Sequence, residues 1–375
     1  MDRFYFDHNS TTPVSPEVLA VYLPVLLEVY GNASSIHHHG QMAKQQLETG
    51  RRQTAKLLGC TTKELVFLSG GTEANNLAIF GVKPRHVITT RIEHPAVLNP
   101  CGQLERQGAA VTYVPVGASG VVDPEDVRRA IRPETGLISV MHVNNETGAI
   151  QPIAEIAAIA RASGVLMHSD GVQAAGKIPF SVEKLGVDLY SISAHKMNAP
   201  KGIGALYVRK GISLEPMFFG GRHEQQRRAG TENVAGAVAL GAASAAVQWM
   251  DEGLRDRLEH GILDRIPDVT VNGERELRSP NTTNLCFDGI EGESLVIALD
   301  LKGFAVSTGS ACSSGAVAPS HVLTAMGFSA QHAKSSVRFS LGRSNTMEQV
   351  DRLVEAICSS VAHLRRLSPA CVSHV

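Results

Sequence analysis

The sequence predicts an α/β protein, with a large domain built on a mostly parallel sheet flanked by helices and a smaller α+β domain. Short β-rich runs alternate with helical stretches from residue 64 to residue 208. Such alternation is typical of a parallel sheet covered by helices on both faces. After about residue 234 the pattern changes to an Ala-rich helix followed by mixed elements. A chain of 375 residues has room for both domains.

The expected elements follow one another in a regular order. In the large domain, each strand leads into a polar or glycine-rich loop, and Asp123 with Pro124 marks a helix start. The strand-containing runs are ELVFLSGG, HVITTRIEH, VTYVPV, GLISVMHVNNETG, VLMHSD, VDLYSISAHK and GIGALYVRKG. Farther along, VAGAVALGAASAAVQWM predicts a long, buried helix over 234–250, and MEQVDRLVEAICSSVAHLRRL predicts a final amphipathic helix.

Composition excludes several classes of protein. A net charge of -1 argues against direct binding of nucleic acid and against a polybasic membrane contact. The amino terminus shows no secretory signal, which predicts a cytoplasmic protein. The chain has 6 cysteines and no CxxC pair, so neither a disulfide scaffold nor a cysteine metal motif is expected. The triple histidine IHHHG gives no ligand spacing, and we expect no metal site.

Polar residues follow the predicted strands, where ligands bind in sheets of this kind. Gly70, Gly71 and Thr72 lie between a strand and a helix start, which suits a phosphate but also an ordinary capped turn. His94 follows the next strand and is either a ring-stacking group or a plain loop residue. Asn145 ends another strand and is either a ligand contact or a turn former.

Two charged residues at strand ends are more informative. Asp170 ends an apolar strand, and an unpaired buried carboxylate is costly, so a cationic partner or a protonated ring nitrogen is expected. Lys196 directly follows the strand VDLYSIS, with His195 beside it. A desolvated lysine becomes a nucleophile toward carbonyls, although a surface lysine after an edge strand is equally compatible. Together, the phosphate cradle, Asp170, His94 and Lys196 indicate a site for pyridoxal 5'-phosphate (PLP).

The chain resembles the cysteine desulfurases, in the fold-type I group of PLP enzymes. The resemblance covers nearly the whole chain and rests on matching blocks in family order. These blocks are DHNSTTP, YGNASSIH, SGGTEANNLAI, EHPAVL, MHVNNETG, DGVQAAGK, SAHKMNAPKGIGALY, RRAGTEN, EGES, STGSACSSG, PSHVL and VRFSLGR. It implies a large PLP-binding domain over 13–250, and a small domain over 1–12 and 251–375 that carries a cysteine loop.

The resemblance also implies a role for each candidate residue. Lys196 forms the Schiff base with PLP and later moves protons. His94 stacks on the pyridine ring and acts in proton transfer, while Asp170 pairs with the ring nitrogen. Gly71, Thr72, Ser193 and His195 hold the phosphate. Asn145 and Gln173 contact the ring substituents, and Arg338, with Asn145, binds the substrate carboxylate.

Cys312 matches the family nucleophile, in a long-loop form of the cysteine loop. It stands in FAVSTGSACSSGAVAPSH, a run without bulky apolar residues, which predicts an exposed loop. The resemblance implies that Cys312 takes sulfur from L-cysteine as a persulfide, releases L-alanine, and passes the sulfur to an acceptor. That acceptor is an iron–sulfur scaffold or another sulfur-acceptor protein. Ala33, Ser10 and Ala318 depart from the usual family residues, and we expect none of them to touch the chemistry.

Other assignments stay open at this point. A selenocysteine lyase or another C–S lyase on the same scaffold is the first alternative. A scaffold without activity and a nicotinamide oxidoreductase are less favoured, the latter because the glycine fingerprint is missing. The resemblance further implies a homodimer in which Thr231, in RRAGTEN, reaches the phosphate of the other subunit's cofactor, and in which the helix from Val234 helps to bury the subunit contact. Cys60 and Cys101 are expected at the surface.

Overall fold

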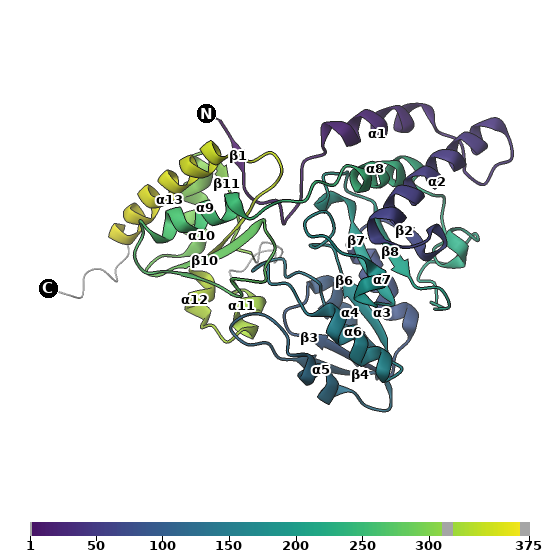
Figure 1. The fold of residues 1–375 in the computed structure, drawn as a ribbon, viewed down its shortest axis with the longest axis horizontal. Helices are drawn as coiled ribbons and strands as arrows, with labels where there is room; N and C mark the ends of the chain where they lie inside the picture. The colour runs from purple at the N-terminus through teal and green to yellow at the C-terminus, as the bar shows by residue number, and fades with distance from the viewer. Residues whose placement is uncertain (1, 310–317, 368–375) are drawn as a thin grey trace.

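The computed structural model describes residues 2–309 and 318–367 (Figure 1). A seven-stranded sheet forms the larger lobe, with strand order β2-β8-β7-β6-β5-β3-β4. Its strands are β2 Leu65–Leu68, β3 His86–Thr90, β4 Ala110–Val114, β5 Thr135–Ser139, β6 Leu166–Asp170, β7 Leu189–Ser193 and β8 Gly204–Val208. β7, β6, β5, β3 and β4 pair in parallel, whereas β8 is antiparallel to both β7 and β2. The predicted α/β class and mostly parallel sheet are confirmed.

Helices cover both faces of this sheet because its strands are apolar on both sides. In β2, Val66 and Leu68 enter one cluster of buried side chains, while Leu65 and Phe67 enter another. The helices of the lobe are α1 Pro16–Glu28, α2 His38–Leu58, α3 Gly71–Val82, α4 Pro95–Arg106, α5 Pro124–Ala130, α6 Ile153–Ala162, α7 Val182–Leu185 and α8 Val234–Ala245. As predicted, Asp123 caps α5 by accepting from the backbone N–H of Glu125.

The Ala-rich helix is shorter than predicted. α8 ends at Ala245, and Trp249, which the sequence placed in the same helix, is 48% exposed. α8 is buried under α1 and α2 of its own chain. It therefore leaves little surface for the subunit contact that the sequence assigned to it.

The smaller lobe contains an antiparallel sheet of order β12-β10-β9 and a parallel pair, β1 with β11. In Figure 1 it lies to the left of the large sheet. Its strands are β1 Phe4–Tyr5, β9 Val269–Val271, β10 Thr282–Phe287, β11 Phe304–Ala305 and β12 Ser336–Ser340. Its helices are α9 Gly253–Leu263, α10 Gly292–Leu301, α11 His321–Ala325, α12 Ala330–Lys334 and α13 Met347–Leu367. α13 is the final helix expected from the sequence.

A separate cluster of buried side chains fills this lobe, with Phe6 from the amino terminus packed among residues 258–361. This separation supports the division at residues 12/13 and 250/251, which we keep as a proposal. Val322 and Leu323 of α11 pack instead in the core of the large lobe. No helix in the described residues combines the length and hydrophobicity needed to cross a bilayer.

Candidate active site

A pocket of about 270 Å³ opens at the carboxyl ends of the parallel strands. Strand-end residues meet here because parallel strands end at the same edge of a sheet. Among its lining residues are these predicted ones: Gly71, Thr72, His94, Asn145, Asp170, Gln173, Ser193, His195 and Lys196. The fold therefore brings together side chains that are separated by up to 125 residues in the sequence.

Lys196 reaches into the pocket from the short 3-10 helix Ala194–Lys196 that directly follows β7. Its Nζ donates to the backbone oxygens of Asn9 and Ser10, at 2.5 and 2.7 Å. Both of these acceptors are backbone carbonyl oxygens of the amino-terminal segment. The amine is thus oriented within the pocket by the amino-terminal segment.

Asp170 ends β6 and is 5% exposed. Its carboxylate accepts from Asn75 Nδ2 at 2.6 Å and from the backbone N–H of Val172 at 3.0 Å. No ion pair to Asp170 occurs within the described residues, so the expected protein cation is not found there. In the same pocket, Asn75 Oδ1 is buried and has no hydrogen-bond partner among the residues that the structure describes. The pocket thus carries an acceptor-rich end that suits a cationic or N–H-bearing ligand.

The opposite chemistry is found where β2 leads into α3. The amino terminus of α3 presents backbone N–H groups, and Thr72 and Ser193 add hydroxyl groups to the pocket wall. A Cβ at Gly71 would lie 2.7 Å from the Val172 side chain, so this turn admits no larger residue without a shift. A helix start of this kind favours an anionic group such as phosphate.

Both histidines of the pocket are held neutral. His94 caps α4, with Nδ1 accepting from the backbone N–H of Ala96 at 3.0 Å, and burial together with nearby Lys196 lowers its pKa. Burial and the charge of Lys196 lower the pKa of His195 to about 4. Since its Nδ1 accepts, neutral His94 carries its proton on Nε2.

Gln173 belongs to a buried polar cluster behind the pocket. Its Nε2 donates to the backbone oxygen of Asn9 at 2.9 Å, and its Oε1 accepts from Lys177. Lys177 also donates to Asn9 Oδ1 at 2.7 Å. Burial and the charges of Lys196 and Arg338 lower the pKa of Lys177 well below its ordinary value.

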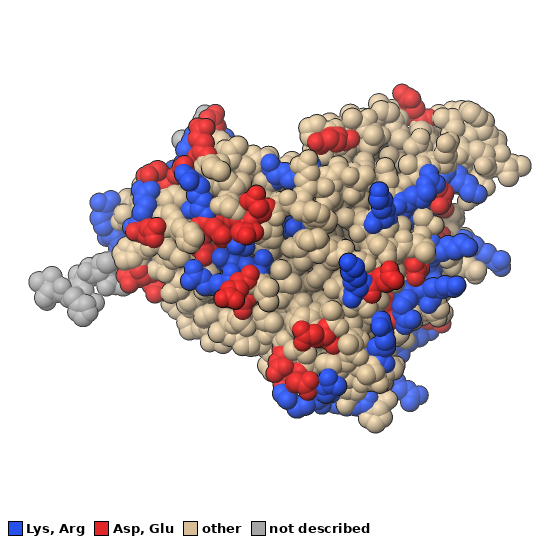
Figure 2. Space-filling model, in the orientation of Figure 1, with Lys and Arg blue, Asp and Glu red and all other residues tan. Residues whose placement is uncertain are grey.

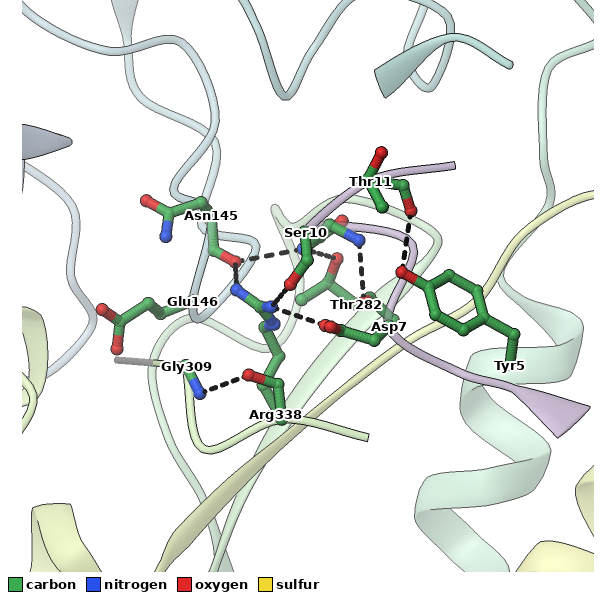
Figure 3. A network of polar contacts seen from close by, with 12 residues as sticks. Tyr5, Asp7, Ser10, Thr11, Asn145, Glu146, Thr282, Gly309 and Arg338 are labelled. Atoms are coloured by element: carbon green, nitrogen blue, oxygen red, sulfur yellow. Dashed lines mark hydrogen bonds and ion pairs between the residues drawn. The ribbon is translucent and has the colours of Figure 1, made fainter. Parts of the chain in front are cut away.

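Arg338, on β12, lies beside the pocket with 3% exposure (Figure 3). Its guanidinium donates to the backbone oxygen of Asn145 at 2.9 Å, to Asp7 Oδ1 at 2.7 Å and to Ser10 Oγ at 2.9 Å. Nε is buried and has no hydrogen-bond partner within the described part of the chain. The predicted carboxylate clamp is therefore already occupied by a carboxylate of the chain itself.

Three predictions on single residues have different outcomes. Thr231 is exposed and does not line the pocket of its own chain. Cys312 lies outside the described residues. Cys101 is fully buried, so its expected surface position is wrong. It shares the inner face of α4 with Val97 and Leu104, at the helical spacing i, i+4, i+7.

Sequence reasoning missed Asn9, Asn75 and Lys177, and it treated Ser10 as chemically silent. Ser10 lines the pocket and contacts Arg338, and its backbone oxygen contacts Lys196. The sequence did contain a signal for Lys177. It stands four residues after Gln173, and that spacing brings two side chains together in a helical turn. For Asn9 and Ser10 only the folded chain supplies the contact, since the amino-terminal segment crosses between the two lobes. Asn75 reaches Asp170 only because α3 packs beside β6.

Comparison with known proteins identifies the family. Residues 4–353 match Aminotransferase class-V. A protein named cysteine desulfurase IscS from Dictyoglomus turgidum is 46% identical over 378 residues, covering 97% of this chain and 96% of the relative. A second cysteine desulfurase IscS, from Methanosarcina thermophila, is 47% identical over 97% of this chain and 93% of its own. The chain belongs to the cysteine desulfurases of aminotransferase class V.

Solved structures agree with this assignment. A NifS-like protein superposes with a TM-score of 0.90 at 36% identity, covering 96% of this chain and 100% of its own. A structure of SspA in complex with cysteine superposes with a TM-score of 0.83 at 35% identity, covering 90% and 98%. Membership of this desulfurase family implies PLP as the cofactor, and it implies cysteine as the substrate.

Proposed function

We propose that the chain removes sulfur from L-cysteine with PLP bound in the pocket around Lys196. The observation that carries this proposal is the convergence of Lys196, Asp170 and His94 with the amino terminus of α3 in one cavity. An amine, a buried carboxylate, a neutral imidazole and an anion-binding helix start are the groups that PLP requires. Desulfurase family membership then selects cysteine among amino-acid substrates.

The pocket fits PLP on its own features. Its volume of about 270 Å³ is close to the roughly 300 Å³ at the lower end of small-molecule sites. Asn75 Oδ1, which has no partner among the described residues, and the Asp170 carboxylate offer acceptors to a ligand, and the helix start with Thr72 offers N–H and O–H donors. Gly71, Thr72, Ser193 and His195 would hold the phosphate, Asp170 the ring nitrogen, and Asn145 and Gln173 the ring substituents. PLP bound here supplies an electron sink for the substrate carbon.

The neighbouring residues then bind the substrate and move protons. Arg338 binds the carboxylate of cysteine, and its unpartnered Nε and paired Nη groups provide the planar donors for that task. Binding exchanges the contact with Asp7 for one with the substrate. Lys196 Nζ would take and return protons at the substrate carbon, and neutral His94, with its proton on Nε2, would serve as a second proton donor in the pocket.

The sulfur leaves on Cys312. The Cys312 thiolate attacks the sulfur atom of the substrate, the C–S bond breaks, and the new S–S bond makes a persulfide. One cysteine and one enzyme thiol give one alanine and one enzyme persulfide, so no external oxidant or reductant is needed. The persulfide then passes to the thiol of an acceptor, an iron–sulfur scaffold or another sulfur-acceptor protein.

Two variants test this reaction. Lys196→Ala should lose turnover, and borohydride treatment of the wild-type protein should leave the pyridoxyl mass on the peptide of Lys196. Cys312→Ser should keep the cofactor absorbance and release almost no sulfide, because a lost covalent nucleophile removes the whole step. Pyridoxyl mass on Lys201 instead, or wild-type sulfide release by Cys312→Ser, would refute the assignment. Activity of Cys312→Ser on selenocysteine but not on cysteine would favour the selenocysteine lyase.

We further propose a homodimer that completes each site. Thr231 is exposed and away from its own pocket, so its predicted contact with phosphate requires a second subunit. The outer side of α1 supports such a contact, with Leu27 74% exposed and Tyr30, just beyond it, 77% exposed. In Figure 2 this part of the surface is tan apart from a few acidic side chains. An exposed apolar face of this kind is typical of a subunit interface.

A further inference from the structure

A second group of reactive side chains lies in the small lobe, apart from the residues that line the PLP pocket. A sulfur of Cys286, a carboxylate oxygen of Asp288 and a ring nitrogen of His332 all lie within 4.8 Å of one another. Cys286 is on β10, Asp288 follows that strand, and His332 is on α12, which lies beside β10 in Figure 1. Cys286 and Asp288 are two residues apart, whereas His332 lies 44 residues after Asp288 in the sequence.

The hydrogen bonds around His332 determine which ring nitrogen is available. His332 Nε2 lies 2.6 Å from Asn272 Oδ1. The amide nitrogen of Asn272 donates to Asn284 Oδ1 at 2.8 Å and to Ser336 Oγ at 2.9 Å, so Oδ1 is the accepting end. Nε2 therefore carries the hydrogen, and Nδ1 keeps its lone pair. Histidines that bind metals are oriented by such an N–H bond to an oxygen.

The ring is also fixed in place. Phe328 stacks on His332 with a centroid separation of 4.4 Å and an interplanar angle of 7°. Orientation and a rigid backing are thus in place before any ion arrives.

The sulfur of Cys286 lies close both to the carboxylate and to the backbone of His332, whose backbone oxygen is 3.5 Å from Cys286 Sγ. Cys286 Sγ lies 3.5 Å from Asp288 Oδ1. Arg365 donates to the backbone oxygen of Asp288 at 3.0 Å, and among residues 2–309 and 318–367 no lysine or arginine forms an ion pair with its carboxylate. Asp288 is exposed and His332 is partly exposed, which leaves a path for an ion from solvent.

We propose that Cys286, Asp288 and His332 bind a Zn²⁺ ion, with the fourth position open to water. One sulfur, one imidazole nitrogen and one carboxylate oxygen form a donor set that suits zinc, whereas Mg²⁺ and Ca²⁺ select oxygen alone. With bonds of about 2.0–2.3 Å, tetrahedral ligand atoms lie about 3.3–3.8 Å apart. Rotation of the exposed Asp288 side chain closes the remaining gap. Zn²⁺ displaces the thiol proton and takes its place between sulfur and oxygen.

The test is a Co²⁺ titration of the PLP-loaded protein carrying Cys312→Ser, which removes the thiol of the predicted loop. We expect one ion per chain, with the charge-transfer absorbance of a cobalt–thiolate bond and full displacement by Zn²⁺. Cys286→Ser in this background should abolish that absorbance. Asp288→Asn and His332→Gln should each weaken binding by about tenfold or more, as loss of a ligand costs at least as much as loss of its supporting contact.

Cys358→Ser is the matched control, because Cys358 is a half-buried thiol on α13 outside this cluster. It should bind Co²⁺ as the parent does. Since Cys286 is buried, Asp288→Asn at the exposed ligand keeps the test decisive if Cys286→Ser does not fold. The proposal would be overturned if the parent showed no cobalt–thiolate absorbance. It would also be overturned if Asp288→Asn and His332→Gln bound Co²⁺ as tightly as the parent does.

Discussion

At the scale of single residues, Asn9 connects more of the site than any residue the sequence singled out. Its backbone oxygen accepts from both Lys196 and Gln173. Its side-chain oxygen accepts from Lys177, and its Nδ2 donates to Thr282 Oγ1 on β10 at 2.9 Å. One asparagine thus joins the predicted cofactor lysine to the small lobe, and every one of these groups is satisfied by a neighbour rather than by water.

The neighbouring Ser10 supplies a prediction about the substrate. Ser10→Ala removes an acceptor from Arg338 but keeps the backbone oxygen that holds Lys196. A hydrogen bond to a charged group contributes about 1.5–3 kcal/mol, and its loss weakens substrate binding by only part of that amount because Ser10 acts through Arg338. We expect the KM for cysteine to rise about three- to tenfold with kcat within about twofold.

Steady-state kinetics on the PLP-loaded enzyme measure both constants. Ser34→Ala, at an exposed serine outside the pocket, is the control and should change neither. A fall in kcat at constant KM would show that Ser10 acts on Lys196 and not on Arg338.

Glu93 predicts a pH dependence of stability. It is fully buried, its Oε2 has no hydrogen-bond partner within residues 2–309 and 318–367, and burial raises its pKa to about 8. The folded protein keeps this proton up to about pH 8, whereas the unfolded chain loses it near pH 4.5. Stability from this group is therefore complete below pH 4.5 and is lost as the pH rises toward 8, by at most about 1.4 kcal/mol per pH unit.

Glu93→Gln removes this titration and keeps the acceptor for Thr90 and Met141. Denaturant unfolding at several pH values should show the difference in unfolding free energy between wild type and variant shrinking or reversing as the pH rises. Buried His168, whose pKa is lowered to about 3, contributes the opposite slope below pH 6.5 in both proteins and cancels in that difference. A difference that is constant with pH would contradict the expectation.

At the scale of elements, the Ala-rich composition of α8 is explained by how closely it packs on α2. A Cβ at Gly50 would lie 2.3 Å from the backbone oxygen of Ala237, and a Cβ at Gly241 would lie 2.5 Å from Gly50 Cα. Two helices that touch backbone to backbone admit only glycine at the crossing. Small residues here therefore serve packing within one chain rather than between subunits.

Gly241→Ala tests this contact. We expect a loss of about 1–3 kcal/mol in unfolding free energy, because the added methyl group forces the two helices apart. Gly102→Ala in α4 is the matched control, since the nearest atom to its Cβ is the flexible Arg106 side chain at 3.9 Å. There the higher helix propensity of alanine should stabilise the protein by up to about 1 kcal/mol. Equal effects of the two variants would refute the close-contact explanation.

At the scale of the whole molecule, the proposed shared site leads to a complementation experiment. Lys196→Ala subunits are mixed with Thr231→Asp subunits. The Thr231→Asp substitution would place a carboxylate next to the phosphate of the other subunit's cofactor and repel it. In a mixed dimer one site carries both lesions and the other carries neither, so activity should return in one of the two sites. Each variant alone should be inactive or weakly active. Verified subunit exchange without recovery would mean that Thr231 serves its own subunit.

Much of the fold and of the PLP pocket was predictable from the sequence, because local chemistry decides those features. Apolar runs set the strands, and Asp123 with Pro124 set a helix start. Asp170 and Lys196 follow their strands directly, and parallel strands bring their ends to one edge whatever the remaining sequence does. The sequence alone therefore determined the α/β class, the edge of the sheet at which the candidate site lies, and most of the residues that line it.

Tertiary structure decided the contacts that cross between lobes or between distant segments. Asn9 meets Lys196, Asp7 occupies Arg338, and His332 meets Cys286 only because separate stretches of chain fold against one another. No periodicity or short spacing encodes such pairings, since each depends on how two elements pack and on which side chains that packing leaves face to face. For the same reason the sequence predicted no metal site where we now propose one, and Ser10, for which the sequence predicted no role, lies against both the predicted clamp and the predicted cofactor lysine.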